Sequence, residues 1–277
     1  MYFLIKISYN IFMKLERILC NIKKDFEDSI ITATFAGRLY TNGNLAKEAL
    51  IRSQKIINYL HEYIKQDFIL NGIDPSKIYP PINKCNPEIK IKGFLKSKDQ
   101  DISILPSSDH IIYAINGDKK TEEILSVNLR SQLSSLQKNI DTLYERTFAE
   151  ALNLHLKYPK QCLGEVYLIP VYSYDDRDMR NNIVSFTGRS KIETYINMFQ
   201  AINLRESYKR DNYKYERVCL LIVDFNKKIP KLYSTLEELK KDHLVSEDFN
   251  TDVSNLSINT FCKDLIKIYK ERFGEIS

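Results

Sequence analysis

The stretch EIKIKGFLKSKDQDISILP, residues 88–106, alternates apolar and polar side chains in two places. Ile89 and Ile91 alternate with lysines, and Ile102 and Ile104 flank a serine. A period of two is typical of β-strands that bury one face. We therefore expect two extended segments here and a fold built on a sheet.

The next two apolar segments extend this sheet. HIIYAI at residues 110–115 and EILSVNLRS at residues 123–131 have the composition of strands, and Asn116-Gly117 between them is a turn signal. The stretch Gly117-Asp118-Lys119-Lys120 lengthens the connection beyond a tight hairpin. We expect both segments to be strands of one sheet.

Helices and buried strands follow. Apolar side chains recur every three or four residues from about Asn139 to Leu156, which predicts a helix with one buried face. LGEVYLIPVY at 163–172 and VCLLIVDF at 218–225 are continuous apolar runs instead, which suits strands covered on both faces.

Two more helices are predicted near the ends of the chain, over residues 45–68 and 257–273. SKIE from Ser190 and STLE from Ser234 place a serine three residues before a glutamate, an arrangement that caps the start of a helix. These motifs bracket the strand of 218–225.

This order of elements predicts an α/β fold, with a mixed central β-sheet flanked by helices. We expect one domain over residues 1–277. It consists of an N-terminal helical region over 13–80, an α/β core over 88–232 and a C-terminal helical region over 233–277.

Composition excludes several classes of protein. The five cysteines are scattered and form no CxxC pair, which argues against a disulfide framework and a zinc site and favours the cytoplasm. No run approaches the roughly 20 apolar residues that span a bilayer. The net charge of +5, from 41 basic and 36 acidic residues, permits a polyanionic partner without requiring one.

The first twelve residues, MYFLIKISYNIF, are apolar, but a charged segment without a small-residue cleavage site follows them. We expect no export signal. Met13 is an alternative start of translation, and a native N-terminus at Met13 would confirm it.

Two short motifs carry a resemblance. KDQDISI at 98–104 places Asp101 before the apolar part of a strand, and SVNLRSQ at 126–132 ends a later strand with polar residues. With the order helix, three strands, helix and strand, these motifs resemble the PD-(D/E)XK nuclease core. Residues 127–155 and the following LGEVYLIP are similar to the XhoI-type branch of type II restriction endonucleases, and the likeness covers roughly residues 90–225.

The resemblance implies a restriction-endonuclease-like core and a site that uses Mg²⁺ or another divalent cation. Asp101 matches the metal-binding aspartate. Where the family has a Glu-X-Lys triplet, this chain has Asn128, Leu129 and Arg130. By this resemblance Asn128 and the Leu129 carbonyl complete the metal shell, Arg130 stabilises the transition-state phosphate, and Gln132 orients the attacking water.

The departures from the triplet leave the site short of a carboxylate. Asn128 brings no charge to a magnesium site, which normally uses carboxylates, and Arg130 cannot act as a base. Our first choice for the missing ligand and catalytic group is Glu145, on the helix after the third strand. The other candidates are Glu48, Glu62, Asp141 and Glu165.

Each of these residues also has a structural interpretation. Asp101 would be a solvated strand end, Asn128 a hydrogen-bonded strand residue, and Arg130 a surface ion pair worth less than about 1 kcal/mol. Asp141 and Glu145 would be the solvated face of a helix.

Basic residues next to aromatic ones are candidates for DNA binding. Arg146 follows Glu145, and the segment around ESYKRDNYKYER at 206–217 carries several more. Phosphate contacts and a solvated loop are both compatible with such a segment. The residues assigned to DNA are Arg146, Arg205, Lys209, Arg210 and Lys214.

A nucleophilic serine is not expected. Ser107 and Ser108 precede His110, but no GxSxG motif accompanies them. His155 falls on the buried face of its helix, where a hydrogen-bonded core histidine is more common.

We therefore expect a type II restriction endonuclease that hydrolyses phosphodiesters of double-stranded DNA. By analogy it would be a homodimer on a palindromic site, with a DNA methyltransferase as its genetic partner. The alternative is a sequence-specific DNA-binding protein that has lost catalysis, because the triplet lacks its Glu and Lys. A third possibility, an enzyme or interaction domain unrelated to nucleic acids, ranks last.

Overall fold

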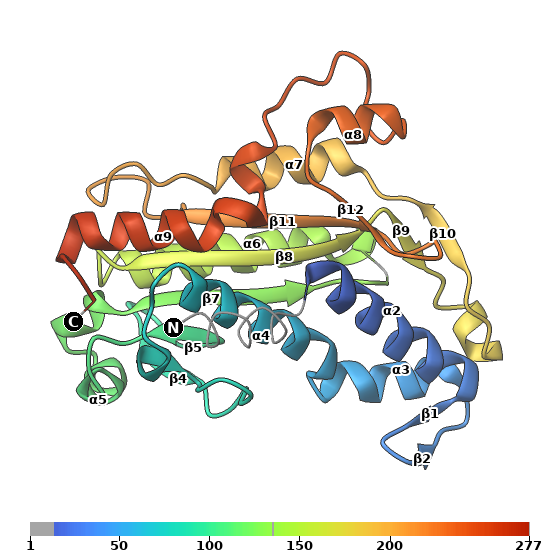
Figure 1. The fold of residues 1–277 in the computed structure, drawn as a ribbon, viewed down its shortest axis with the longest axis horizontal. Helices are drawn as coiled ribbons and strands as arrows, with labels where there is room; N and C mark the ends of the chain where they lie inside the picture. The colour runs from blue at the N-terminus through green and yellow to red at the C-terminus, as the bar shows by residue number, and fades with distance from the viewer. Residues whose placement is uncertain (1–13, 135, 277) are drawn as a thin grey trace, which may run out of the picture.

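The computed structural model describes residues 14–134 and 136–276. These residues form an α/β fold around a central six-stranded mixed sheet (Figure 1). The expectations about an export signal and a start at Met13 lie outside the described residues. In spatial order the strands are β12 (Lys231–Tyr233), β11 (Arg217–Asp224), β8 (Cys162–Pro170), β7 (Leu125–Ser131), β6 (Ile102–Ile104) and β3 (Ile78–Tyr79).

Strand directions divide the sheet into two halves. β3, β6 and β7 form an antiparallel meander, whereas β7, β8 and β11 are parallel. β12 returns antiparallel to β11. Helix α6 (Leu136–His155) lies in the crossover from β7 to β8, as a parallel connection requires. The predicted mixed sheet flanked by helices is confirmed.

Each face of the sheet is covered by helices. Val127 and Leu129 pack on the face that carries α2 (Leu15–Thr32), α4 (Lys55–Leu70) and α9 (Ile258–Phe273). The opposite face packs against α6 and α7 (Ile192–Ala201). Figure 1 shows α4 and α9 in front of the sheet and α6 behind it. Because both faces are dry, β8 and β11 are buried along their whole length, as continuous apolar runs predict.

Smaller elements surround this sheet. Three two-stranded hairpins pair β1 (Thr34–Phe35) with β2 (Arg38–Leu39), β4 (Ile89–Lys92) with β5 (Ser97–Gln100), and β9 (Tyr172–Tyr174) with β10 (Phe186–Arg189). The remaining α-helices are α3 (Gly43–Arg52), α5 (Asp109–Asn116) and α8 (Leu236–Lys241). Short 3₁₀ turns are η1 (Pro75–Lys77), η2 (Lys119–Glu123), η3 (Asp178–Asn181) and η4 (Ser254–Leu256).

The predicted strand at 110–115 is wrong, because this segment forms helix α5. His110 and Ala114, four residues apart, are the buried positions of the helix, and Ile112 is exposed. Gly117 ends the helix in a left-handed conformation and donates its N–H to the Tyr113 carbonyl. A short apolar run fits a strand and a helix equally well, so only packing decides between them.

The N-terminal helix is also interrupted. The predicted helix over 45–68 consists of α3 and α4, with Gln54 between them at a positive φ of 62°. The predicted caps are wrong as well. Thr235 and Glu238, one residue beyond Ser234 and its partner, form the capping box of α8, and the Ser190 hydroxyl donates to the Pro170 carbonyl.

Across the described residues, no helix is both long and apolar enough to cross a lipid bilayer.

The contact between α9 and β8 depends on Gly164. A Cβ at this position would lie 2.8 Å from the side chains of both Phe261 and Leu265. We expect Gly164→Ala to lower the free energy of unfolding by about 1–3 kcal/mol, because an overpacked core must shift its side chains or backbone. Urea denaturation measures this. Gly188→Ala, which meets nothing within 4 Å, is the control, and equal stability of both variants would contradict the prediction.

Candidate functional site

Asp101 and Asn128 meet where strands β6 and β7 pair. Asp101 lies in the bend before β6, and the pairing of Ile102 with Val127 places it opposite Asn128. Its backbone N–H donates to the Asn128 Oδ1 at 3.2 Å. Its own Oδ2 accepts the Leu129 N–H at 2.6 Å. The Asp101 carboxylate thus accepts a backbone N–H of β7, in the place where a carbonyl of a paired strand would accept it. The two predicted site residues, Asp101 and Asn128, are therefore in contact.

Arg130 connects this pair to the next strand and to helix α6. Its Nε lies 2.6 Å from Glu165 Oε1 on β8, and its Nη2 lies 2.9 Å from Glu150 Oε2 on α6. The register of β7 and β8 pairs Asn128 with Glu165, which brings the second carboxylate to the same place. Glu165, a named candidate, therefore lies at the site. Glu150 has no counterpart in the sequence-based prediction.

Glu150 is surrounded by hydrogen-bond donors. Its Oε1 accepts from Asn128 Nδ2 at 2.8 Å and from Gln100 Nε2 at 3.2 Å. Its Oε2 accepts from Arg130 and from Lys98 Nζ, the latter at 3.1 Å. Four donors saturate a carboxylate that is 4% exposed. We call this group the Asp101 cluster, and it consists of Lys98, Gln100, Asp101, Asn128, Arg130, Glu150 and Glu165.

Burial shifts the ionisation of the acidic members. It raises the pKa of Asp101 to about 7, although the Leu129 N–H favours the charged form. It also raises the pKa of Glu165 to about 8, and Arg130 opposes this rise. The pKa of Arg130 itself is raised, first by Glu165 and then by Glu150, so this side chain stays cationic.

His61 lies beside Asp101 and was not singled out in the sequence. Its Nε2 is 3.9 Å from Asp101 Oδ2, and the side chain comes from α4. Burial, and then Lys65, lowers the pKa of His61 to about 4, so the ring is neutral at neutral pH. Neither ring nitrogen has a hydrogen-bond partner among the described residues.

The arrangement does not fit a divalent cation as the side chains lie. No group of three or more His, Cys, Asp or Glu side chains within residues 14–134 and 136–276 is placed to hold a metal ion. Glu150 has its lone pairs taken by four donors, and Glu165 is fully buried against Arg130. Asp101, with 23% of its side chain exposed, is the carboxylate of the cluster that solvent reaches best.

The first-choice carboxylate lies elsewhere. Glu145 and Asp141 are exposed on α6, as the interpretation of a solvated helix face predicts, whereas Glu150 is the acidic side chain of this helix that points at the cluster. Gln132 is also apart from the cluster. It lines a cavity of about 290 Å³ beside Phe26, and its side chain donates to the Ser134 carbonyl.

The other named acids have different partners. Glu62 accepts from Lys65 and from the Asn83 N–H, and Glu48 pairs with Arg52 on the surface of α3.

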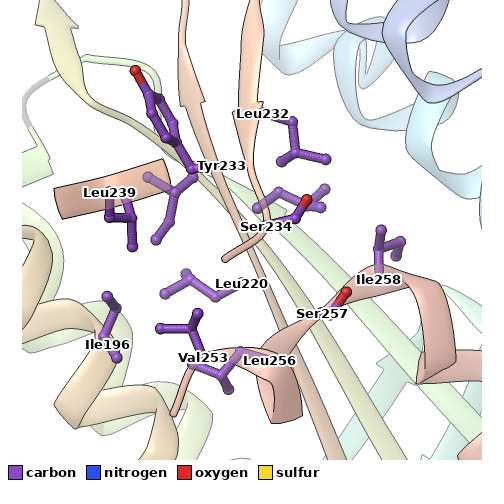
Figure 2. Close-up of a pocket in the computed structure, with 12 residues that line it drawn as sticks. Ile196, Leu220, Leu232, Tyr233, Ser234, Leu239, Val253, Leu256, Ser257 and Ile258 are labelled. Carbon is purple, nitrogen blue, oxygen red and sulfur yellow. The ribbon is translucent and has the colours of Figure 1, made fainter. Parts of the chain in front are cut away.

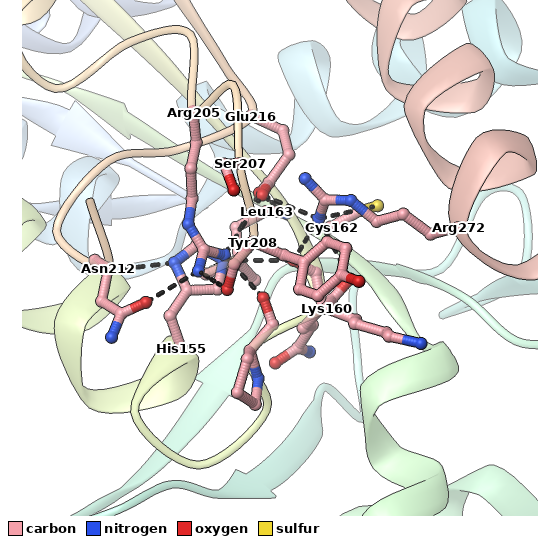
Figure 3. Close-up of polar contacts among 12 residues, drawn as sticks. His155, Lys160, Cys162, Leu163, Arg205, Ser207, Tyr208, Asn212, Glu216 and Arg272 are labelled. Carbon is pink, nitrogen blue, oxygen red and sulfur yellow. Dashed lines mark hydrogen bonds and ion pairs between the residues drawn. The ribbon is translucent and has the colours of Figure 1, made fainter. Parts of the chain in front are cut away.

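Arg205, assigned to DNA from the sequence, is buried. It is 2% exposed, and its guanidinium donates to the carbonyls of Pro159 and Tyr208 and to Asn212 Oδ1, each within 2.8 Å (Figure 3). This side chain holds the 206–216 loop against the body of the protein. In this conformation it offers no donor to a phosphate.

Glu216 is the acidic centre around which Arg205 lies. Arg272 Nη1 from α9 is 2.8 Å from Glu216 Oε1, and the Leu163 N–H donates to Oε2 at 2.7 Å (Figure 3). Burial alone would raise the pKa of Glu216, but His155, Arg272 and Arg205 lower it to about 2. The group is a structural ion network. Both ring nitrogens of His155 lie 3.1 Å from carbonyl oxygens, which confirms the predicted core histidine.

The other basic residues assigned to DNA lie nearer the surface. Arg146, Lys209 and Arg210 are exposed, and Lys214 is half-buried.

Ser107 and His110 are closer than the sequence suggested. Ser107 Oγ is 3.0 Å from His110 Nδ1, and His110 Nε2 is 3.2 Å from Glu123 Oε2. The Ser107 N–H also donates to Nδ1, at 3.3 Å. The two Ser107–His110 bonds join residues three apart at the start of α5, and the third joins His110 to Glu123 on η2. The N-cap residue Ser108 makes no side-chain capping bond, so we interpret the three bonds as a local structural network.

An apolar cavity near β11 is too small for a substrate. Figure 2 shows Ile196, Leu220 and Val253 converging on it from α7, from β11 and from the segment before α9. Its volume is about 20 Å³, close to the space of a single water. Pockets for small organic ligands measure about 300–1,000 Å³.

No family model, no curated protein and no solved structure matches this chain.

The buried arginine can be tested against an exposed one in the same loop. We expect Arg205→Met to lower the free energy of unfolding by about 3 kcal/mol, because buried carbonyls and part of the Glu216 charge lose their partner. Arg210→Met should change it by less than about 0.5 kcal/mol. Chemical denaturation followed by circular dichroism measures both values, and equal stabilities would refute the structural role of Arg205.

The raised pKa of Asp101 predicts a pH dependence of stability. In the unfolded chain this carboxyl loses its proton at a pH of about 4, whereas the folded chain holds it until about pH 7. Between these values the folded state binds more protons, so this group makes the free energy of unfolding fall as pH rises.

We expect the free energy of unfolding of the Asp101→Asn variant to fall less steeply as pH rises from about 4 to about 7, because an amide does not titrate. Urea midpoints at a series of pH values measure the slope. Asp99→Asn, an exposed neighbour on β5, is the control. If Asp101→Asn and the parent have the same slope, the carboxyl does not titrate in this range.

Proposed function

We propose that this chain is a type II restriction endonuclease that hydrolyses phosphodiesters of double-stranded DNA at the Asp101 cluster. The observation that carries the proposal is the contact of Asp101, just before β6, with Asn128 and Leu129 in the middle of β7. The order α4, β3, β6, β7, α6 and β8, with β4, β5 and α5 as insertions, supports the proposal because it agrees with the helix, three strands, helix and strand of the nuclease core that the sequence resembles. Asp101 precedes the second of these strands, and Arg130 lies on the third.

The exposed edge of the cluster has the chemistry that a phosphate needs. Arg130 and Lys98 have 25% and 31% of their side chains exposed, so both cations are within reach of a ligand. A guanidinium binds a phosphate in two places and stabilises charge that develops on it. Lys98 brings from β5 the amine that the third strand lacks.

Asp101 is the proposed proton acceptor for the attacking water. A carboxyl with a pKa of about 7 exchanges protons readily near neutral pH. The Leu129 N–H holds the carboxylate in place, and Glu165 and Glu150 hold Arg130. Magnesium is expected from the resemblance alone. Because the donor set does not fit it as it lies, we assign no step to a cation.

A second candidate is a DNA-binding protein on the same fold that does not cleave. The specific observation in its favour is that Asn128, Gln100, Lys98 and Arg130 saturate Glu150. A carboxylate bonded in this way holds Lys98 and Arg130 in position to bind a phosphate. The cluster would then bind DNA but would have no pair of free carboxylates for catalysis.

The wider proposal retains several expectations from the sequence. Arg146, Lys209, Arg210 and Lys214 are proposed phosphate contacts, and Arg205 is withdrawn because its donors are bonded inside the protein. A homodimer, a palindromic site, a partner DNA methyltransferase and a cytoplasmic location remain part of the proposal.

Cleavage and binding assays separate the two candidates. We expect the parent protein to cut a panel of plasmid and phage DNAs in the presence of Mg²⁺ or Mn²⁺. Asp101→Asn should lower the rate about 100-fold or more, because it removes the proton acceptor. It should bind duplex DNA with unchanged affinity in fluorescence anisotropy.

The control variant is Asp99→Asn, which should cleave like the parent. A parent that binds DNA but never cuts it would favour the second candidate. A parent that binds no duplex at low salt, where phosphate contacts are strongest, would refute both.

A further inference from the structure

The turn between β4 and β5 presents two large apolar side chains to solvent. Phe94 is 59% exposed, and Leu95 is 81% exposed. Single exposed apolar residues are ordinary on protein surfaces. Two in succession at the tip of a hairpin are a different arrangement, because they form one projecting apolar surface.

The backbone of this tip is fixed by helix α6. The Asn153 side chain accepts the N–H groups of Leu95 and Lys96, at 2.8 and 3.0 Å, and donates to the Lys96 carbonyl. The Phe94 N–H donates to the Asn153 carbonyl at 2.9 Å. A Cβ on Gly93 would lie 2.1 Å from Asn153 Nδ2, so this position requires a glycine.

A turn held in this way displays its side chains at little entropic cost. Loops ordered before binding lose less conformational freedom when a partner arrives. The exposed tip of the hairpin therefore has the character of a binding element.

The charge around the tip favours a polyanion. The hairpin and its two flanks carry Lys90, Lys92, Lys96 and Lys98 against Glu88, Asp99 and Asp101, and residues 92–98 around the tip include three lysines and no acid. Lys90 pairs with Asp99 at 3.7 Å on the surface. An isologous contact between two copies of the tip would bring like charges together, which is unfavourable.

The tip lies next to the Asp101 cluster. Lys98 and Gln100 on β5 bond to Glu150, and the tip bonds to Asn153, one turn further along α6. Three residues span at most about 11 Å even when the chain is extended, so the Leu95 and Lys98 backbones lie within that distance of each other. A duplex whose phosphate lies at the cluster has its groove within that distance.

We propose that Phe94 and Leu95 form a wedge that enters the groove of duplex DNA and inserts between stacked base pairs. The inference rests on the proposed function, because it uses a phosphate held at the Asp101 cluster. Apolar side chains inserted in this way unstack a base step and bend the duplex, and the added contact surface offsets the cost. The lysines of the hairpin bind the phosphates on either side.

The test uses duplex DNAs of varied sequence that carry the fluorescent base 2-aminopurine, whose emission rises when it is unstacked. We expect the parent protein to raise this emission at low salt. Phe94→Ala with Leu95→Ala should abolish the rise and lower the affinity about tenfold, equivalent to about 1.4 kcal/mol. Because both side chains are exposed, the double variant should fold as the parent does.

Ile112→Ala with Ile115→Ala is the matched control, since it removes two exposed apolar side chains from α5 nearby. It should bind and unstack DNA like the parent. Asn153→Ala keeps both tip residues but releases the turn, and we expect it to lose part of the emission and several-fold in affinity.

Each other result overturns the wedge. If the parent binds duplexes without raising emission, and the double variant binds equally well, the wedge is wrong and the proposed function stands. If the parent binds no duplex, the proposed function and the wedge both fail. If the double variant instead turns a dimer into a monomer in analytical ultracentrifugation, the tip is a protein interface.

Discussion

The ion pairs of Arg130 with Glu165 and Glu150 constrain the whole site. One guanidinium joins three elements, because it lies on β7 and bonds to β8 and α6. A buried carboxylate without a partner costs several kcal/mol, so Glu165 depends on Arg130, whereas Glu150 would keep Lys98 as an ion-pair partner. The Arg130–Glu150 bond also joins α6 to the sheet, in addition to the apolar packing of that helix.

The hairpin β4–β5 depends on this arrangement. Glu150 receives Lys98 and Gln100 from β5, and Asn153 on the next turn holds the tip of the hairpin. The chain then passes from β5 through Asp101 into β6. A single helix face therefore sets the distance between the proposed chemical centre and the exposed apolar tip. Recognition and chemistry would share one rigid support.

Sequence periodicity predicted the buried strands of the parallel half of the sheet, because strands covered on both faces are continuous apolar runs. The resemblance to the nuclease core, and not the periodicity, led us to expect Asp101 and Asn128 close together, and they are in contact. The periodicity did not predict helix α5, because a short, largely apolar segment such as residues 110–115 fits a helix and a strand alike. It could not show that Arg205 is buried, because a basic residue looks the same whether its partner is a phosphate or the chain's own carbonyl groups.

The sequence by itself thus determined the class of fold, and its resemblance to a known core named Asp101, Asn128 and Arg130 at the centre of the candidate site. Only the tertiary structure decided which carboxylates complete it. Glu145 and Glu150 both lie on α6, and the rotation of that helix about its axis exposes the first and buries the second. That rotation follows from long-range packing and from Arg130, because neither acid has a local preference for the sheet. Contacts between residues far apart in sequence leave no local pattern.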